Sequence, residues 1–267
     1  MQISFFKYQG TGNDFIMIDN RAGKTTLNSS QVAALCHRRF GIGADGLIIL
    51  DNEPGVDFRM VYFNSDGNTS SMCGNGGRCI VAFARQLGII KDRARFMAVD
   101  GLHEAMIDEK GRIALKMQDV KNIEVGSDHF FLDTGSPHFV KFVTDLENLN
   151  VTDEGRRIRN SDRFVEKGTN VNFIEKREDE VFVRTYERGV EDETYSCGTG
   201  VTAAALVAAI KGYSTSRNSC SINTLGGELE VSFEKVLEHN FYNIWLKGPA
   251  LLVFSGEIEL LDHVAEG

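Results

Sequence analysis

The sequence predicts an α/β protein, of α+β type, built from two related halves. Short apolar or alternating runs typical of strands fill most of each half, and one long helix-forming stretch lies within each. These stretches, 74–88 and 198–212, both follow a cysteine and both close on glycine, as helix C-termini often do. The second copy begins a little under half the chain length after the first. The repetition indicates two related lobes that each deliver one cysteine.

Cys73 and Cys197 are expected at the first residue of these two helices. The positive end of the helix dipole favours thiolate over a thiol whose ordinary pKa is about 8.5. The unpaired N–H groups of a first turn form an anion site that suits a carboxylate, and glycines there let a ligand approach the backbone. Two thiols facing one cleft can remove a proton from one side of a carbon and return it from the other. A single Cys-Gly pair is more often a small buried residue beside a turn, but its double occurrence with matching helices argues against that alternative.

The remaining pattern predicts strands around one helix per half. A helix capped by Asn28 or Ser29 should run to about Arg39. The polar run 118–127 is the expected lobe junction, giving a first lobe at 1–120 and a second at 121–251, with a strand at about 252–267 returning to the first. Strands are expected at 3–8, 15–19, 47–50, 58–63, 96–99 and 112–117, and at 139–143, 171–175, 181–186, 221–224, 229–233 and 244–246.

Composition agrees with a soluble intracellular enzyme. The chain has 267 residues, of which 42% are hydrophobic and 25% charged, and its net charge is −9 without a basic face, so nucleic acid is not an expected partner. No apolar run approaches the roughly 18 residues of a membrane span, and the N-terminus lacks the order of a signal peptide, so we expect a cytoplasmic protein without a membrane partner. Five cysteines favour reduced thiols over a disulfide framework, and we interpret Cys36, Cys79 and Cys220 as packing residues.

Two further motifs do not support a cofactor or a metal. The segment 41–46 matches G-x-G-x-x-G, but a helix precedes it and a strand follows it, the reverse of a dinucleotide site. Cys73 and Cys79 lack zinc-ligand spacing, and His37, His103 and His138 form no compact pair with them. We therefore expect neither a cofactor nor a metal.

Several polar residues are candidates for ligand contacts. Asn13, Asn64 and Asn170 each lie beside glycine-containing turns, where turn formation alone can explain an asparagine. The pair Glu187–Arg188 ends a strand before Gly189 and can equally be a surface ion pair. His138 can be a structural, hydrogen-bonded histidine.

Five motifs stand out along the chain: the segments 10–15 (GTGNDF), 64–67 (NSDG), 72–78 (MCGNGGR), 187–189 (ERG) and 197–200 (CGTG). Taken together, these residues resemble the diaminopimelate epimerase family over almost the whole chain. The resemblance implies two pseudo-symmetric lobes, each a curled mixed sheet around a central helix, with the active site in the cleft between them. It also implies inversion of one α-carbon of LL-2,6-diaminopimelate to the meso form without pyridoxal phosphate or metal, in lysine and peptidoglycan precursor synthesis, by an enzyme that is commonly a homodimer.

At the reacting end, the resemblance implies that Cys73 and Cys197 exchange the roles of base and acid with reaction direction. Backbone amides of the pairs Gly74–Asn75 and Gly198–Thr199 would hold the α-carboxylate, where charge builds as the carbanion forms. Glu187, with the backbone near Arg188, would hold the reacting ammonium.

At the distal end, the resemblance implies contacts from Asn13, Asn64, Asn170 and the Arg188 guanidinium, whose fork suits a carboxylate. This chain departs from many relatives in having Ser136 before Pro137 and His138, where they have Asn. A distal contact at this position would be made by the shorter hydroxyl, through water, or not at all. Some relatives have Gln in place of Gly46, and any contact from that side chain is absent here.

Two alternatives stay open from the sequence. A proline or hydroxyproline racemase-like enzyme of the same fold also uses two cysteines, although such relatives typically have His where this chain has Asn75 and a cyclic substrate has no distal carboxylate for Arg188. A thiol redox protein would explain the two cysteines but not the polar residues around them.

Overall fold

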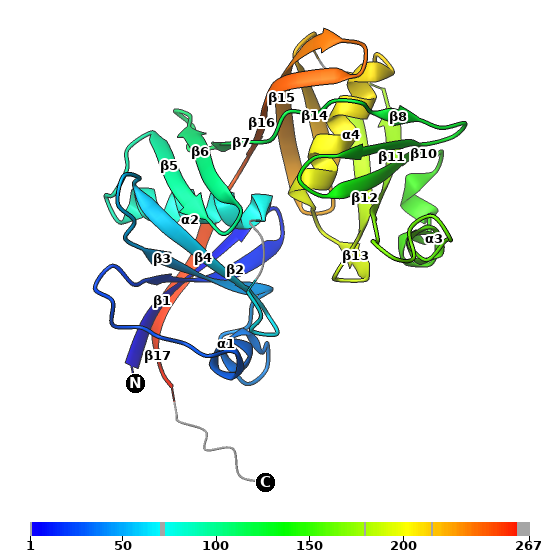
Figure 1. The fold of residues 1–267 in the computed structure, drawn as a ribbon. Helices are drawn as coiled ribbons and strands as arrows, with labels where there is room; N and C mark the ends of the chain where they lie inside the picture. Colours follow the sequence, from blue (N-terminus) through cyan, green and yellow to red (C-terminus); the bar gives the residue numbers. More distant parts are fainter. Residues whose placement is uncertain (1, 70–72, 179, 215, 261–267) are drawn as a thin grey trace. The chain divides into compact units, whose positions relative to one another are not determined.

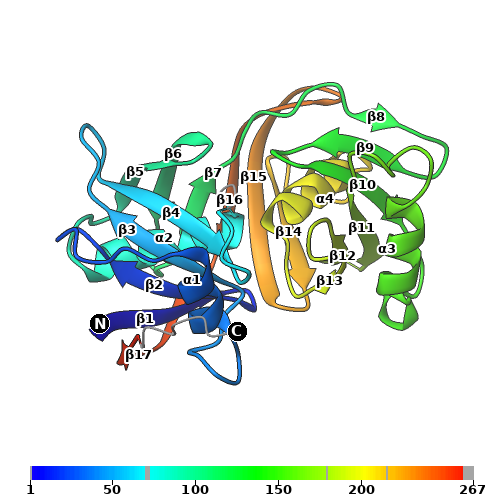
Figure 2. The same ribbon diagram turned by 60° about the horizontal axis from the view of Figure 1, so that its bottom comes forward.

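The computed structural model describes residues 2–69, 73–178, 180–214 and 216–260. It divides into two compact units, Met1–Asp108 with Ala250–Gly267, and Glu109–Pro249 (Figures 1 and 2). The second unit therefore begins at Glu109, earlier than residue 121, where the sequence suggested the boundary. The C-terminal strand of the first unit ends at Glu259, and residues 261–267 of the predicted returning segment lie outside the described residues.

The first unit is a mixed sheet that carries two helices. The short helix α1 (Ser29–Cys36) contacts β3, and the long helix α2 (Gly74–Gln86) packs on β1, β2 and β3. In neighbour order the strands are β17 (Leu251–Glu259), β1 (Gln2–Gly10), β2 (Asn13–Asp19), β3 (Gly46–Asp51), β4 (Phe58–Asn64), β5 (Arg93–Ala98) and β6 (Gly101–Ile107).

The second unit is a longer mixed sheet that curls around helix α4 (Gly198–Ile210), which contacts strands from β9 to β16 (Figure 2). A 3₁₀ turn (Leu146–Asn148) and helix α3 (Val151–Arg159) lie on its outside, and β13 (Asp192–Thr194) pairs with the end of β12. In neighbour order the strands are β8 (Glu124–Val125), β9 (Phe130–Asp133), β10 (Pro137–Phe142), β11 (Asn170–Arg177), β12 (Glu180–Glu187), β14 (Ser219–Thr224), β15 (Gly227–Leu237), β16 (Asn240–Gly248) and β7 (Ile113–Lys116).

The same series of pairings recurs in both units. From β1 to β6, successive neighbours are antiparallel, parallel, antiparallel, parallel and antiparallel. The series β9, β10, β11, β12, β14, β15 has the same directions. In each series a short helix follows the second strand and the long helix follows the fourth. The predicted duplication, with one central helix per half, is therefore confirmed.

Helix α4 shows why its residues form a buried helix. Alanine, the strongest helix former, dominates its middle, and the side chains from Val201 to Ala208 are all buried. Both long helices end as predicted, since Gly88 and Gly212 adopt φ values of +71° and +74° just past the last turn.

Two sequence expectations fail. Helix α1 ends at Cys36 rather than near Arg39, because His37 turns extended and its Nδ1 accepts the N–H groups of Arg39 and Phe40, both at 3.1 Å. The junction expected at 118–127 lies inside the second unit, because Val120 and Ile123 are buried there and Val120 bridges to Phe241.

Several further elements are too short or too polar for the sequence pattern to predict them. Strands β6, β8, β9 and β13 and helix α3 were not expected. Helix α3 is capped by Asn150, whose side chain accepts from the N–H of Asp153 at 3.1 Å, and it buries only Val151, Gly155 and Ile158. So small an apolar face gives little periodic signal.

Candidate functional site

Cys73 and Cys197 occupy the same position in the two units, the N-cap of the long helix. Both have extended backbones, and their carbonyls accept the first helical hydrogen bonds, from Gly77 at 2.7 Å and from Val201 at 2.8 Å. Neither thiol accepts a capping hydrogen bond from the first turn of its helix. The predicted placement of both thiols is confirmed. Cys36, Cys79 and Cys220 are buried, as expected of packing residues.

In the first unit, Asn13 and Asn75 lie beside Cys73. The Cys73 thiol donates to Asn13 Oδ1 at 3.6 Å, and Asn75 Nδ2 donates to the same oxygen at 3.3 Å. Asn13 begins β2 after a turn in which Thr11 and Gly12 adopt φ values of +50° and +86°. The structure thus brings two of the other predicted residues, Asn13 and Asn75, to the Cys73 thiol.

A buried arginine lies beneath this first turn. The Arg78 guanidinium is fully buried and donates to Asn75 Oδ1 at 2.9 Å, to Thr11 Oγ1 at 3.1 Å and to the Gly74 carbonyl at 3.2 Å. Its positive charge adds to the helix dipole at the turn that would bind an anion. Sequence reasoning gave Arg78 no role beyond the motif it completes.

In the second unit, Ser136, Asn170 and Arg188 form one polar cluster. Asn170 Nδ2 donates to Ser136 Oγ at 2.9 Å, and Asn170 Oδ1 accepts the Arg188 N–H at 2.9 Å. The Arg188 guanidinium reaches Ser136 Oγ at 3.3 Å and the Lys167 carbonyl at 3.1 Å. Asn170 is buried, whereas Arg188 is exposed and able to meet a ligand. The shorter hydroxyl of Ser136 therefore joins the two residues expected at the distal end.

Behind Cys197 lies a buried polar network that the sequence did not reveal. Asn172 Nδ2 donates to His138 Nδ1 at 3.0 Å, and Thr185 Oγ1 donates to Asn172 Oδ1 at 3.0 Å. A Cβ atom on Gly200 would lie 2.4 Å from Asn172 Oδ1 and 3.4 Å from the Cys197 Cβ, so glycine is required there. Burial, and the charge of Arg188, lower the pKa of His138 to about 3, which keeps its imidazole neutral.

The remaining predicted residues of the second unit lie near the end of β12 and the start of α4. The Glu187 carboxylate accepts from Thr194 Oγ1 at 2.8 Å. Thr199 Oγ1 lies 3.4 Å from the Cys197 thiol, and its carbonyl accepts from Thr134 Oγ1 at 2.9 Å. Thr134, another residue without a sequence signal, thus ties the first turn of α4 to the end of β9.

Asn64 and Gly46 lie opposite each other in neighbouring strands, at the end of β4 and the start of β3. A Cβ on Gly46 would lie 2.6 Å from the Phe63 carbonyl and 2.6 Å from the Tyr62 ring. The Tyr62 ring and the β4 backbone therefore explain why this chain has glycine where some relatives have a longer side chain.

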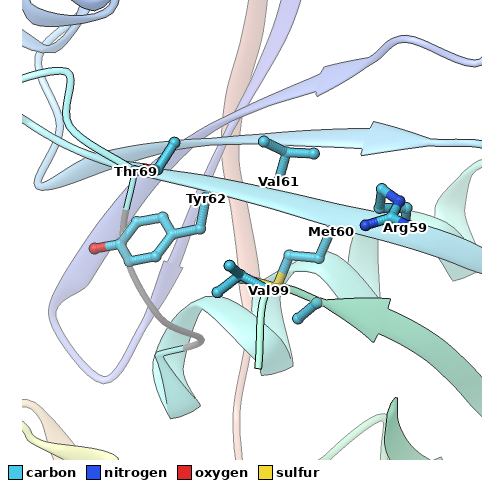
Figure 3. A pocket seen from close by; sticks show the side chains of 7 residues that line it. Arg59, Met60, Val61, Tyr62, Thr69 and Val99 are labelled. Atoms are coloured by element: carbon cyan, nitrogen blue, oxygen red, sulfur yellow. The ribbon is translucent and has the colours of Figure 1, made fainter. Parts of the chain in front are cut away.

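A cavity of about 190 Å³ lies on β4, next to the turn between β5 and β6 (Figure 3). Residues from β4 line it, together with Thr69, Ala98 and Val99, and neither cysteine nor any other predicted site residue is among the lining residues.

Within the described ranges, no cluster of three or more His, Cys, Asp or Glu side chains is arranged to hold a metal ion. In the same ranges, no helix is long and apolar enough to cross a membrane.

Comparison with known proteins bears on these two thiol sites. The family model named diaminopimelate epimerase matches residues 5–123 and 130–253. A protein named diaminopimelate epimerase from Flavobacterium psychrophilum is 53% identical over 259 residues, covering 96% of this chain and 100% of its own length. One of the same name from Chlorobaculum tepidum is 44% identical over 260 residues, covering 94% and 99%.

The chain belongs to the diaminopimelate epimerase family. Membership makes it an isomerase of the amino-acid epimerase class, as the sequence predicted.

Solved structures of other families share the fold. A PhzF-family phenazine biosynthesis protein from Bacillus anthracis has a TM-score of 0.74 at 15% identity, covering 97% of this chain and 100% of that one. A hydroxyproline epimerase from Agrobacterium vitis has a TM-score of 0.68 at 13% identity, covering 98% and 94%. At these identities the likeness extends to the fold alone.

Proposed function

We propose that this epimerase interconverts LL- and meso-2,6-diaminopimelate by a two-cysteine acid–base reaction. The observation that carries the mechanism is the equivalent placement of Cys73 and Cys197, each at the N-cap of the long helix after the fourth strand of its series. The substrate follows from the relatives' names and from a polar cluster suited to a second amino-acid head. The product would serve lysine and peptidoglycan synthesis.

In this reaction one cysteine is a thiolate and the other a thiol, on opposite faces of the α-carbon. The thiolate takes the α-proton, and the electron pair of the broken C–H bond delocalises into the carboxylate. The opposite thiol then returns a proton to the other face, so the enzyme ends with the protonation of its two sulfurs exchanged. The mechanism requires that the two units place their cysteines on either side of one substrate, which is part of the proposal.

First-turn amides stabilise the charge that develops in this step. Those of Gly74 and Asn75, over the buried Arg78, and those of Gly198 and Thr199 are the donors for the reacting carboxylate. Glu187 is the acceptor for the reacting ammonium, and Thr194 holds its carboxylate.

The distal head of the substrate would contact Asn13 and Asn64 from the first unit and Asn170 and Arg188 from the second. Arg188 already lies against Ser136 and Asn170, and its guanidinium can bond both oxygens of a carboxylate. We assign Ser136 and His138 to the support of this end rather than to proton transfer, because the neutral, buried His138 is a poor base at neutral pH.

The chemistry needs neither a cofactor nor a metal, because two thiols and fixed dipoles supply every proton and charge in the scheme.

We further propose a cytoplasmic homodimer. Support for the dimer comes from Leu251, Leu252, Val253 and Phe254, four consecutive apolar residues of β17 that are each about half exposed. Strand β17 pairs only with β1 among the described strands, so its other edge is open to a second copy.

The test of function is hydrogen exchange during turnover. Reduced protein with LL-diaminopimelate in D₂O should form the meso isomer and place solvent deuterium at one α-carbon. Proline and hydroxyproline, run in parallel, should show no exchange, because they have no second head for Arg188. Exchange into proline but not into diaminopimelate would favour the racemase-like alternative and overturn the proposal.

A further inference from the structure

Two side-chain amides near Cys73 form a hydrogen-bonded chain between two charged groups. At one end, Arg78 donates to Asn75 Oδ1 at 2.9 Å. In the middle, Asn75 Nδ2 donates to Asn13 Oδ1 at 3.3 Å, and at the other end Asn13 Nδ2 donates to Asp45 Oδ2 at 2.7 Å. The Cys73 thiol meets this chain at Asn13 Oδ1.

The charged ends determine the direction of the chain. A guanidinium only donates and a carboxylate only accepts, so each amide must turn its oxygen toward Arg78 and its nitrogen toward Asp45. Rotating Asn13 by half a turn would place its carbonyl oxygen 2.7 Å from a carboxylate oxygen, where the two repel each other. The atom that faces Cys73 is therefore an oxygen, which can accept from a thiol but cannot donate to a thiolate.

Asp45 is held firmly enough to impose this orientation although its side chain is partly exposed. Its Oδ1 accepts from Arg38 at 2.6 Å, and its backbone N–H donates to Asp14 Oδ1 at 3.0 Å. Asp14 in turn binds Arg38 and the buried Lys7. Asp45 thus brings the segment 41–46, whose glycines resemble a nucleotide motif in sequence, into this network.

We propose that Asp45 is a positioning residue that holds the Asn13 carbonyl toward Cys73 and so biases Cys73 toward its proton-carrying form before substrate binds. This role rests on the proposed function, because a Cys73 that carries its proton is ready to act as the acid of the two-cysteine reaction. Asn13 keeps a second N–H for the distal end of a ligand, so positioning and binding do not compete.

Other groups of the first unit also act on Cys73. Arg78 and the dipole of α2 favour thiolate, whereas Asp14 and Asp45 favour thiol, and Lys7 and Arg38 offset those two carboxylates. Burial raises the pKa of the neighbouring Cys79, which stays a neutral thiol. The contribution of Asn13 must therefore be measured as a difference between variants.

The measurement is the pH dependence of iodoacetamide alkylation at each cysteine, followed by peptide mass spectrometry on the full chain without substrate. Asp45→Asn removes the stronger of the two contacts that orient the Asn13 amide and leaves only the 3.3 Å donation from Asn75, so the amide can turn an N–H toward the sulfur and the Cys73 midpoint should fall by about half a pH unit or more. The Cys197 midpoint should not change. Asp19→Asn removes a carboxylate that is also paired with an arginine in the same unit but does not contact Asn13, and it should leave Cys73 unchanged.

A double-mutant cycle separates positioning from the direct field of Asp45. In an Asn13→Ala background, Asp45→Asn should lower the Cys73 midpoint by clearly less than in the wild-type background, because only the direct field of the lost carboxylate remains. An unchanged midpoint in the single variant, or an equal fall in both backgrounds, would overturn the positioning role. Because the assay uses no substrate, its outcome is independent of whether the wild-type protein epimerises diaminopimelate.

Discussion

Asn172 donates a hydrogen bond to Nδ1 of the buried His138 at 3.0 Å. The same amide nitrogen also donates to the Phe139 carbonyl at 3.1 Å, and its oxygen accepts from Thr185. Nδ1 of His138 is therefore an acceptor, and the ring proton sits on Nε2. A neutral imidazole of one tautomer is thus built into the sheet behind Cys197.

This relationship predicts a pH dependence of stability. Burial, with the charge of Arg188, lowers the pKa of His138 from 6.5 to about 3. Between these values the unfolded chain takes up a proton that the native imidazole does not, so the free energy of unfolding falls as pH falls. From pH 7 to pH 5 the loss should be about 2 kcal/mol.

Urea unfolding of the wild type and of His138→Gln at both pH values measures this term. The Gln variant can keep a hydrogen bond to Asn172 but cannot titrate, so its loss between pH 7 and pH 5 should be smaller by that amount. Equal losses in the two proteins would show that His138 is not held neutral.

Gly200 lies too close to Asn172 to carry a side chain. In Gly200→Ala the added methyl group would meet Asn172 Oδ1 at 2.4 Å, so either the network or the first turn of α4 must move. We expect a loss of about 1–3 kcal/mol in the free energy of unfolding, with a large fall in kcat because Cys197 moves too. Gly212→Ala, where a left-handed glycine has open space around it, should lower stability without lowering kcat. Full activity in Gly200→Ala would contradict the proposed importance of this packing.

Arg188 is expected to determine selectivity for the distal head. Arg188→Lys replaces a fork with a point donor, so kcat/KM for diaminopimelate should fall by about 10- to 100-fold. The wild type should process lysine, which has no second carboxylate, far worse than diaminopimelate. Arg163→Lys, which changes an exposed arginine paired with Glu124, is the matched control and should be silent. Comparable kcat/KM for lysine and diaminopimelate would remove this role.

The exposed apolar run of β17 gives a test of the dimer. Val253→Asp places a charge among the four exposed residues, and sedimentation velocity should show the shift from dimer to monomer. Val236→Asp, at an equally exposed valine of β15, should leave the dimer intact. A monomeric wild type at micromolar concentration would contradict the proposed assembly.

The sequence predicted the large features of the fold because they depend on long, repeated signals. The two cysteine-led helices carry apolar residues over three turns and end on glycine, and their duplication implied a duplicated sheet. Strand β8 has two residues and β13 has three, too few for an alternating pattern to appear. The end of α1 depends on hydrogen bonds to the His37 ring, and the spacing of apolar residues carries no signal for such a side-chain contact.

The same distinction applies to the candidate site. Residues inside motifs, such as Cys73 or Arg188, could be proposed from the sequence and from the family resemblance. Asp45 and Asn172 act only through a neighbour that is distant in sequence, 32 residues away for Asp45 and Asn13 and 34 for Asn172 and His138. Only the pairing of strands brings them into contact. Positioning residues of this kind therefore appear once the structure is known.

The most direct test of the two-cysteine mechanism is α-hydrogen exchange by the two single variants. Under reducing conditions in D₂O, Cys73→Ala and Cys197→Ala should each fail to invert either stereoisomer, because inversion needs a proton donor opposite the base. Each should still exchange the α-hydrogen of the one stereoisomer that faces its remaining thiol, and the two variants should act on opposite hands. Inversion at a near wild-type rate by either variant would contradict the account.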